Sequence, residues 1–135
     1  MEHKLNQTIE RTALSNLVSN EDYCRKVLPF IKPDYFSVKE ERIVFEEITN
    51  FVDKYRKMPT KISLEIEVET RKDLTETEHQ KIVEIIKTLD STDVDMEWLV
   101  DTTEKFCKDK AIYNAIVDGI GIIDGKDKNR GADAI

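Results

Sequence analysis

The amino-acid sequence predicts an all-α fold: a small globule of about five helices followed by one long C-terminal helix. Three observations favour this architecture. Apolar residues recur every three or four positions in most of the longer segments. Residues that favour helix starts or stops stand at the ends of several of these segments. Only one stretch, residues 62–68, has the strict alternation that is typical of a strand.

The first two helices are separated by a polar cap. Residues from Glu2 to Ser19 place apolar side chains on one helical face, and Asn20 follows them as a suitable N-cap. The second helix is expected from Glu21 to Leu28. It ends there because Pro29 and Pro33 lack the amide hydrogen that a helix interior requires.

An apolar loop and a strongly patterned third helix follow. The loop holds large apolar residues, which predicts that it is pinned into the core: Phe30, Ile31, Tyr35 and Phe36. Ser37 and Glu40 have the spacing of a capping box, and the helix that they open continues to about Tyr55. Its inward face is expected to consist of Ile43, Phe45, Ile48, Phe51, Val52 and Tyr55.

Residues 62–68 leave two interpretations open. Four apolar residues alternate with polar ones, namely Ile62, Leu64, Ile66 and Val68. Periodicity alone therefore indicates a strand. However, no second strand with a hairpin turn lies nearby, and a solitary strand leaves its backbone groups unpaired. The interleaved glutamates are also poor strand formers. We therefore expect a short helix here.

The last part of the chain divides into three sections. Thr75 and Glu78 form a second predicted capping box, which opens a helix that runs to Leu89. A polar connection follows, and its aspartates, Asp93 or Asp95, can cap the long helix. We therefore divide the chain into a helical head, a long arm helix and a flexible tail, comprising residues 1–95, 96–124 and 125–135.

The far end of the long helix is the predicted functional feature. Residues 96–124 at about 1.5 Å each span roughly 43 Å, whereas a compact chain of this length has a radius of gyration of about 14 Å. The far end therefore overshoots the globule, and we predict that its apolar stripe is a protein interface. The stripe consists of Tyr113, Ile116, Val117, Ile120 and Ile123. Nearer the start, Trp98 and Phe106 are expected to be core anchors rather than platforms for stacked bases.

Two glycines near the end of this helix permit alternatives. Each glycine costs a helix interior about 1 kcal/mol relative to alanine, so Gly119 and Gly121 could end the helix near Asp118. Alternatively, they let a second helix approach closely. Together with Gly125 and Lys126 they resemble a phosphate-binding loop, but the glycine spacing is one residue short and no serine or threonine follows the lysine. We therefore predict no nucleotide site here.

Composition argues against several classes of function. The net charge of −7 disfavours binding of the isolated chain to a phosphate backbone. No apolar run approaches about 18 residues, so we expect no membrane-spanning segment. Cys24 and Cys107 are lone thiols without a CxxC motif. This indicates reduced, buried cysteines and a cytoplasmic protein.

No arrangement of residues indicates catalysis or metal binding. His3 and His79 are isolated in polar surroundings, so surface positions are expected rather than metal ligands. The acidic residues within 65–69 and 76–78 leave open a cation site or a general acid, but helix capping and helix-end charge explain them more simply. We predict no catalytic residue, no metal site and no cofactor in this chain.

Three groups of residues occur in an informative order. They are Glu10-x3-Leu14-x2-Leu17, Ile31-x3-Tyr35-Phe36 and Arg42-Ile43-x-Phe45-x2-Ile48. In this order and spacing they resemble the N-terminal domain of DnaB-type replicative helicases, most closely those of large T-even-like tailed phages. Pro59-Thr60 with the apolar segment after it matches the next part of that domain. The run from Trp98 to Ile123 is similar to the helix that enters the family's N-terminal helical hairpin.

The resemblance has consequences for fold and function. It implies helix at residues 62–68, and it makes the long helix the first arm of a hairpin whose second arm lies beyond Ile135. It also implies a ring hexamer that translocates on single-stranded DNA and unwinds duplex with ATP and magnesium, through a motor domain C-terminal to this chain. The present chain would be a non-enzymatic collar domain that organises the ring and contacts primase. Single-stranded DNA would be bound only by the full-length ring, in the host cytoplasm if a phage encodes it.

An alternative is an autonomous helical adaptor or inhibitor without a motor. The gene downstream of Ile135 separates the two hypotheses. A continuing reading frame with a GxxxxGK[ST] motif supports the helicase, whereas a stop codon supports the adaptor. A small enzyme with acidic catalysis around residues 65–78 is the least favoured hypothesis.

Overall fold

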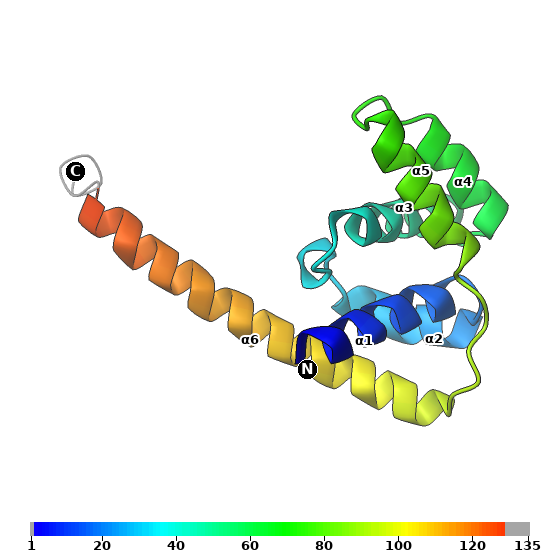
Figure 1. Cartoon of the computed structure of the whole chain (residues 1–135). Coiled ribbons are helices and arrows are strands. Elements are labelled where there is room, and N and C mark those ends of the chain that lie inside the picture. Colours follow the sequence, from blue (N-terminus) through cyan, green and yellow to red (C-terminus); the bar gives the residue numbers. More distant parts are fainter. Residues whose placement is uncertain (1, 129–135) are drawn as a thin grey trace.

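The computed structural model describes the backbone of residues 2–128 and the side chains of residues 7–121. Within this range every regular element is helical (Figure 1), so the predicted all-α fold is confirmed. The elements in chain order are α1 (Glu2–Leu17), α2 (Glu21–Val27), η1 (Leu28–Phe30), η2 (Pro33–Tyr35), α3 (Lys39–Tyr55), α4 (Lys61–Glu69), α5 (Glu76–Lys87) and α6 (Met96–Lys128). The elements η1 and η2 are single turns of 3-10 helix.

The turn between α1 and α2 forms as predicted. The Asn20 side chain accepts a hydrogen bond from the backbone N–H of Tyr23 at 2.9 Å, which caps α2. The apolar loop after α2 is held in the core by Ile31, Tyr35 and Phe36, all of which are buried. Phe30 is the exception. It was predicted to be pinned inside, but it is exposed at the end of η1, where the proline-bounded turn directs it outward.

The start of α3 differs from the prediction. The N-cap is Val38, which has no side-chain cap, so the proposed Ser37–Glu40 capping box is wrong. Instead, the N–H and the hydroxyl of Ser37 donate to the two carboxylate oxygens of buried Glu10 on α1, at 2.7 and 3.0 Å. A second carboxylate, that of Glu41 on α3, accepts from Nε of Arg11 on α1 at 2.8 Å. These contacts join α1 to α3.

Helix α3 lies at the centre of the head, as expected. Its buried apolar side chains include Ile43, Phe45 and Ile48, and the rings of Phe36 and Phe45 lie with centroids 5.1 Å apart. Tyr55 was predicted to point inward but is exposed, because α3 ends there. Arg56 follows in the left-handed conformation with φ 56° and donates its N–H to a carbonyl of the last turn.

The ambiguous segment is helical. In α4 a capping box links Thr60 and Ser63, a signal that the sequence reasoning missed. Leu64 and Val68, four residues apart, lie on its buried face. Helix α5 begins with the predicted capping box of Thr75 and Glu78.

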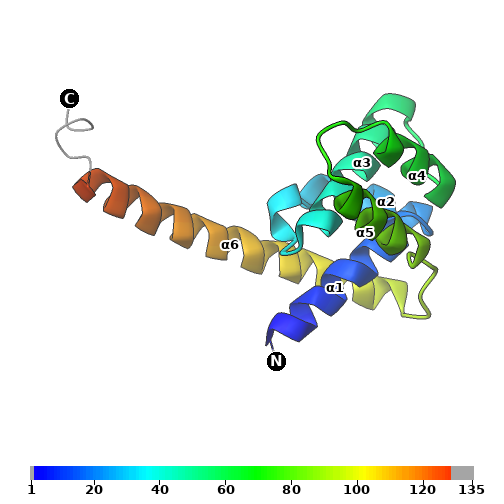
Figure 2. The same ribbon diagram turned by 45° about the horizontal axis from the view of Figure 1, so that its top comes forward.

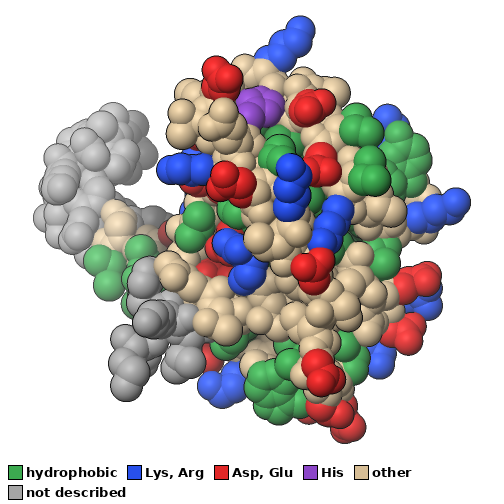
Figure 3. Space-filling view, turned by 45° about the vertical axis from the view of Figure 1, so that its right-hand side comes forward, with side chains coloured by type: hydrophobic (Ala, Val, Ile, Leu, Met, Phe, Trp, Pro, Cys, Tyr) green, Lys and Arg blue, Asp and Glu red, His purple; other side chains and the backbone are tan. Residues whose placement is uncertain are grey.

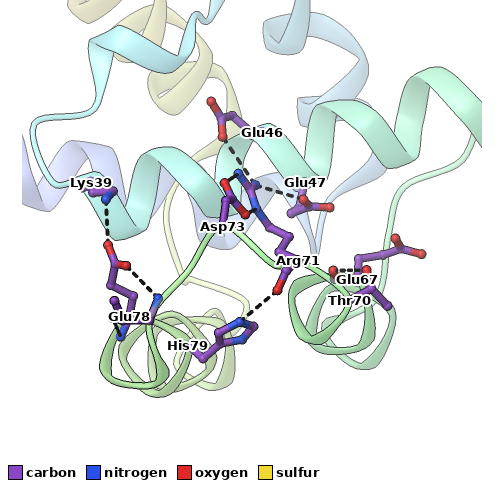
Figure 4. A network of polar contacts seen from close by, with 10 residues as sticks. Lys39, Glu46, Glu47, Glu67, Thr70, Arg71, Asp73, Glu78 and His79 are labelled. Carbon is purple, nitrogen blue, oxygen red and sulfur yellow. Dashed lines mark hydrogen bonds and ion pairs between the residues drawn. The ribbon is translucent and has the colours of Figure 1, made fainter.

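A polar network fastens α4 and α5 to α3 (Figure 4). The guanidinium of Arg71, in the connection between α4 and α5, pairs with Glu47 at 3.1 Å and with Asp73 at 2.9 Å. The hydrogen bond from Arg71 lowers the pKa of Asp73 to about 2, whereas burial raises the pKa of Glu47. Lys39 at the start of α3 pairs with Glu78 at 2.7 Å. The α4–α5 hairpin is therefore held by charge as well as by apolar packing.

Helix α6 is longer than predicted. The Asp95 carboxylate accepts from the backbone N–H of Trp98 at 2.9 Å and caps its first turn. The helix passes along α1 and α2 and then leaves the head (Figures 1 and 2). It continues to Lys128, so the segment from Gly125 to Lys128 is helical rather than the start of the tail. The tail residues 129–135 lie outside the described part of the chain.

Candidate protein interface on the long helix

The inner part of α6, up to Cys107, belongs to the core of the head. Leu99, Thr103, Phe106 and Cys107 are buried where α6 packs on α1, α2 and η2. The hydroxyl groups of Tyr23 and Thr103 form a buried hydrogen bond of 2.7 Å between α2 and α6. Burial raises the pKa of Tyr23 to about 12, so this hydroxyl stays protonated. The root of the helix is thereby fixed in position and rotation.

Trp98 is not a core anchor, in contrast to the prediction. It is exposed, whereas Leu99 and Phe106 are buried. Successive residues of a helix are turned by about 100°, so the residue before a buried Leu99 can point away from the head. The expectation for Phe106 is confirmed.

The outer part of α6, from Lys108 onward, carries a stripe of exposed apolar side chains. Between Lys108 and Gly121 no residue is buried. The exposed fractions of the five large apolar residues in this stretch run from 46% to 63%, for Ile112, Tyr113, Ile116, Val117 and Ile120. We call these five residues the arm stripe. Both ribbon views show this part of α6 extending away from the head with no other element beside it (Figures 1 and 2).

The arm stripe contains four of the five predicted interface residues. Their spacing puts them within about half a turn of one another on the helix surface. The side chain of the fifth, Ile123, lies outside the described side chains. The sequence reasoning omitted Ile112, although its position four residues before Ile116 could have revealed it.

The arm stripe continues the face that packs on the head. Leu99, Phe106, Tyr113 and Ile120 follow one another at intervals of seven residues. Seven residues complete nearly two turns, so these side chains drift by only about 20° per step around the helix. The first two are covered by the head and the last two are exposed.

The glycines of the arm do not interrupt it. Gly119 and Gly121 lie within α6 and neither has a positive φ, so the alternative in which the helix ends near Asp118 is ruled out. A Cβ atom at either position would have no neighbouring atom within 4 Å. Among the residues that the structure describes, nothing therefore requires glycine there. Close approach of a second helix remains a prediction.

The described residues hold no cluster of histidine, cysteine, aspartate or glutamate that could bind a metal ion. A ring nitrogen of His79 donates to the carbonyl oxygen of Arg71 at 3.2 Å, and Glu78 is occupied by its cap and by Lys39. Cys24 and Cys107 are free buried thiols, and burial raises the pKa of Cys107 to about 11. Such a thiol is a poor nucleophile at neutral pH. The candidate site that these residues leave is the exposed arm stripe.

Comparison with known proteins decides the family. The family model of the DnaB-like helicase N-terminal domain matches residues 2–97, more than two-thirds of the chain. The chain belongs to this family. It is also 31% identical over 102 residues to the DnaB-like replicative helicase of Enterobacteria phage T4. The resemblance inferred from the sequence is thus confirmed.

The family match covers the head of this DnaB-like N-terminal domain but little of its arm. The family match ends at Glu97, in the first turn of α6, so the arm stripe lies beyond it. The alignment to the phage T4 helicase includes 76% of this chain and 21% of that protein, so the chain spans about a fifth of the length of its curated relative. Among the described residues, no helix has both the length and the apolar composition needed to cross a bilayer.

Proposed function

We propose that this DnaB-like N-terminal domain is the collar of a hexameric replicative helicase, which assembles the ring and docks primase during DNA replication. The full-length protein would unwind DNA with ATP and magnesium through a motor domain, and single-stranded DNA would contact only the complete ring. The family match and the similarity to the DnaB-like replicative helicase of phage T4 support the helicase part of this proposal. The exposed arm stripe supports the assembly part.

The arm stripe is suited to pairing with the arm of a neighbouring protomer. A contact between two such helices would remove a few hundred Å² of apolar surface from water, worth roughly 25 cal/mol per Å² before the costs of association. The root of α6 is fixed by the Tyr23–Thr103 hydrogen bond and by buried Leu99 and Phe106, so the stripe is presented on a pre-ordered helix. Pre-ordering lowers the entropy that pairing must overcome.

The assembly proposal is tested by placing a charge in the stripe. Ile116→Asp and Ile120→Asp should each weaken self-association of this chain and of the full-length protein, because an aspartate buried between helices loses its hydration. Sedimentation velocity over a concentration series measures the change. The matched control is Ala111→Asp, which puts the same charge on the opposite side of the same exposed helix. Circular dichroism should show that all three variants remain folded.

The outcome against the assembly proposal is equally clear. If Ile116→Asp and Ile120→Asp sediment like the parent protein at every concentration, the arm stripe does not mediate assembly. An equal loss of association in Ala111→Asp would show that charge anywhere on the arm is enough, and would also count against the stripe.

Primase docking needs its own measurement. Isothermal titration calorimetry of this chain with the cognate primase should give a saturable binding isotherm. Repeating the titration with Ile116→Asp separates the two roles, because a variant that fails to assemble but still binds primase places docking on the head. An absence of heat with both the chain and the full-length ring would remove primase docking from the proposal.

A further inference from the structure

Helix α4 is apolar on two opposite sides. Leu64 and Val68 lie on the inner side and are fully buried against the head. Ile62 and Ile66 lie on the outer side and are 68% and 55% exposed. Both pairs have the i, i+4 spacing of neighbours on one helical face. The inner pair accounts for how α4 is held in the fold, whereas the outer pair contributes almost nothing to the core.

The charged residues of α4 are also placed unfavourably with respect to the helix dipole. Its basic residue, Lys61, stands at the N-terminus, where it pairs with Asp90, and the last turn has no basic residue. Glutamates occupy positions 65, 67 and 69, towards the C-terminal end, where the helix dipole disfavours negative charge. Glu65 and Glu69 are spaced four apart, so they also repel each other.

Glu65 and Glu69 differ from the acidic residues that hold α4 and α5 on α3. Glu47, Asp73 and Glu78 each form an ion pair with an arginine or lysine side chain. By contrast, neither Glu65 nor Glu69 forms an ion pair with any residue in the described part of the chain. The outer face of α4 therefore combines two exposed isoleucines with two unpaired carboxylates on the same short helix.

We propose that this outer face, formed by Ile62, Glu65, Ile66 and Glu69, is a docking site for an amphipathic helix of a partner protein whose apolar residues are flanked by lysine or arginine. Such a helix covers the isoleucines, pairs with the carboxylates and relieves their mutual repulsion. It would pack on α4 as a further helix, in the helix-in-groove manner.

The same charges decide against other occupants. A nucleic acid would bring phosphates to a surface of unpaired glutamates, which repel them. A second copy of this chain meeting the site symmetrically would set Glu65 and Glu69 against their own counterparts. A basic helix from another protein removes both conflicts.

The site is separate from the arm. Helices α4 and α5 lie on the side of α3 that faces away from α6 (Figure 1). Figure 3, in which the right-hand side of Figure 1 comes forward, shows hydrophobic side chains exposed among acidic and basic ones. The inference therefore does not depend on the proposed pairing of arms, and a variant in one surface leaves the other unchanged.

Fluorescence anisotropy with a labelled helical peptide tests the proposal. The probe has leucines on one face and lysines on both flanks, and a second peptide has glutamate in place of every lysine. The lysine peptide should bind the 135-residue chain saturably. Ile62→Ser/Ile66→Ser should weaken binding by about tenfold or more, and Glu65→Gln/Glu69→Gln by several-fold with a smaller dependence on salt. The control Trp98→Ser, which removes an exposed aromatic on α6, should bind within about twofold of the parent chain.

A second readout locates the peptide. With isoleucine methyl groups labelled for NMR, the lysine peptide should shift the resonances of Ile62 and Ile66 and leave those of Ile112 and Ile116 in place. The proposal is overturned if the shifts are confined to the arm, if the glutamate peptide binds as tightly as the lysine peptide, or if the isoleucine variant binds like the parent chain. Loss of a dimer in the isoleucine variant, seen by sedimentation, would assign the face to a second copy and also overturn it.

Discussion

The two parts of α6 present the same face to different surroundings. Phe106 and Tyr113 are aromatic residues one heptad apart, yet Phe106 is buried under the head and Tyr113 is exposed. Leu99 and Ile120, the first and last residues of the same heptad series, show the same contrast. Periodicity therefore specifies which side of a helix is apolar, but it does not specify what covers that side. Only the tertiary structure separates a core residue from a candidate interface residue.

The largest effect is expected from truncating the two aromatic residues in parallel. Phe106→Ala should lower the free energy of unfolding by about 3 kcal/mol, because it removes a buried ring and leaves a cavity. Tyr113→Ala should change it by less than about 0.5 kcal/mol, because an exposed side chain contributes little to the core. Urea denaturation followed by circular dichroism measures both. Equal losses would mean that Tyr113 is covered within the chain and would remove the difference between the two parts.

A smaller effect is expected where the inner part is fastened to α2. Tyr23→Phe should lower the free energy of unfolding by about 1–2 kcal/mol, because it leaves the buried hydroxyl of Thr103 without its partner. Thr103→Val alone should cost a similar amount. The double variant should cost less than the sum of the two, which a double-mutant cycle detects. Strict additivity would show that the 2.7 Å contact does not couple α2 to α6.

Substitution of the glycines in the outer part of α6 should increase stability, unlike the two preceding sets of variants. Gly119→Ala and Gly121→Ala should each stabilise the arm locally by about 1 kcal/mol, because alanine favours the helix and a Cβ atom meets no neighbour at either position. Hydrogen exchange of the arm amides measures this at concentrations where the chain is monomeric. If Gly119→Ala also weakens self-association, a second helix approaches closely there. Faster exchange in either variant would contradict the open surroundings of these glycines.

Acid should weaken the attachment of α5 to α3, at a distance from α6. The hydrogen bond with Lys39 and the helix cap lower the pKa of Glu78 from 4.5 to about 2. Because the folded state binds this proton less tightly than the unfolded state, the contribution of Glu78 is present above pH 4.5 and is lost as the pH falls towards 2. Glu78→Gln keeps the capping acceptor but removes the charge. It should lower the urea midpoint at pH 7 and reduce the decline between pH 4.5 and pH 3. An unchanged acid profile would show that other carboxyls control it.

Local signals in the sequence were enough to predict most of the fold. Asn20 and the Thr75–Glu78 capping box act within four residues of the chain, and both form as predicted. The helix at 62–68 was predicted because no partner strand was evident, although its apolar residues alternate as they would in a strand. The alternation has a structural meaning, because it divides the apolar residues between the inner and outer faces of α4.

The errors arose where distant residues compete for the same group. Ser37 is taken by Glu10, which lies 27 residues earlier, so the hydroxyl is not available to cap α3. The exposure of Phe30 and Trp98 depends on which side of each element the head covers, and the neighbouring residues do not encode this. Four of the five arm-stripe residues were predicted because their exposure depends only on periodicity and helix length. The outer face of α4 was missed because its residues were interpreted only as evidence for strand or helix.

The continuity of α6 has a mechanical consequence. One unbroken helix closes the core at Leu99 and continues to Lys128, so no hinge separates the globule from its projection. The 21 residues beyond Cys107 form a lever of about 32 Å. A tilt of the globule by about 10° would therefore swing the tip sideways by about 5 Å, the height of one helical turn. A partner bound to the tip of α6 would therefore be displaced whenever the globule changes its orientation.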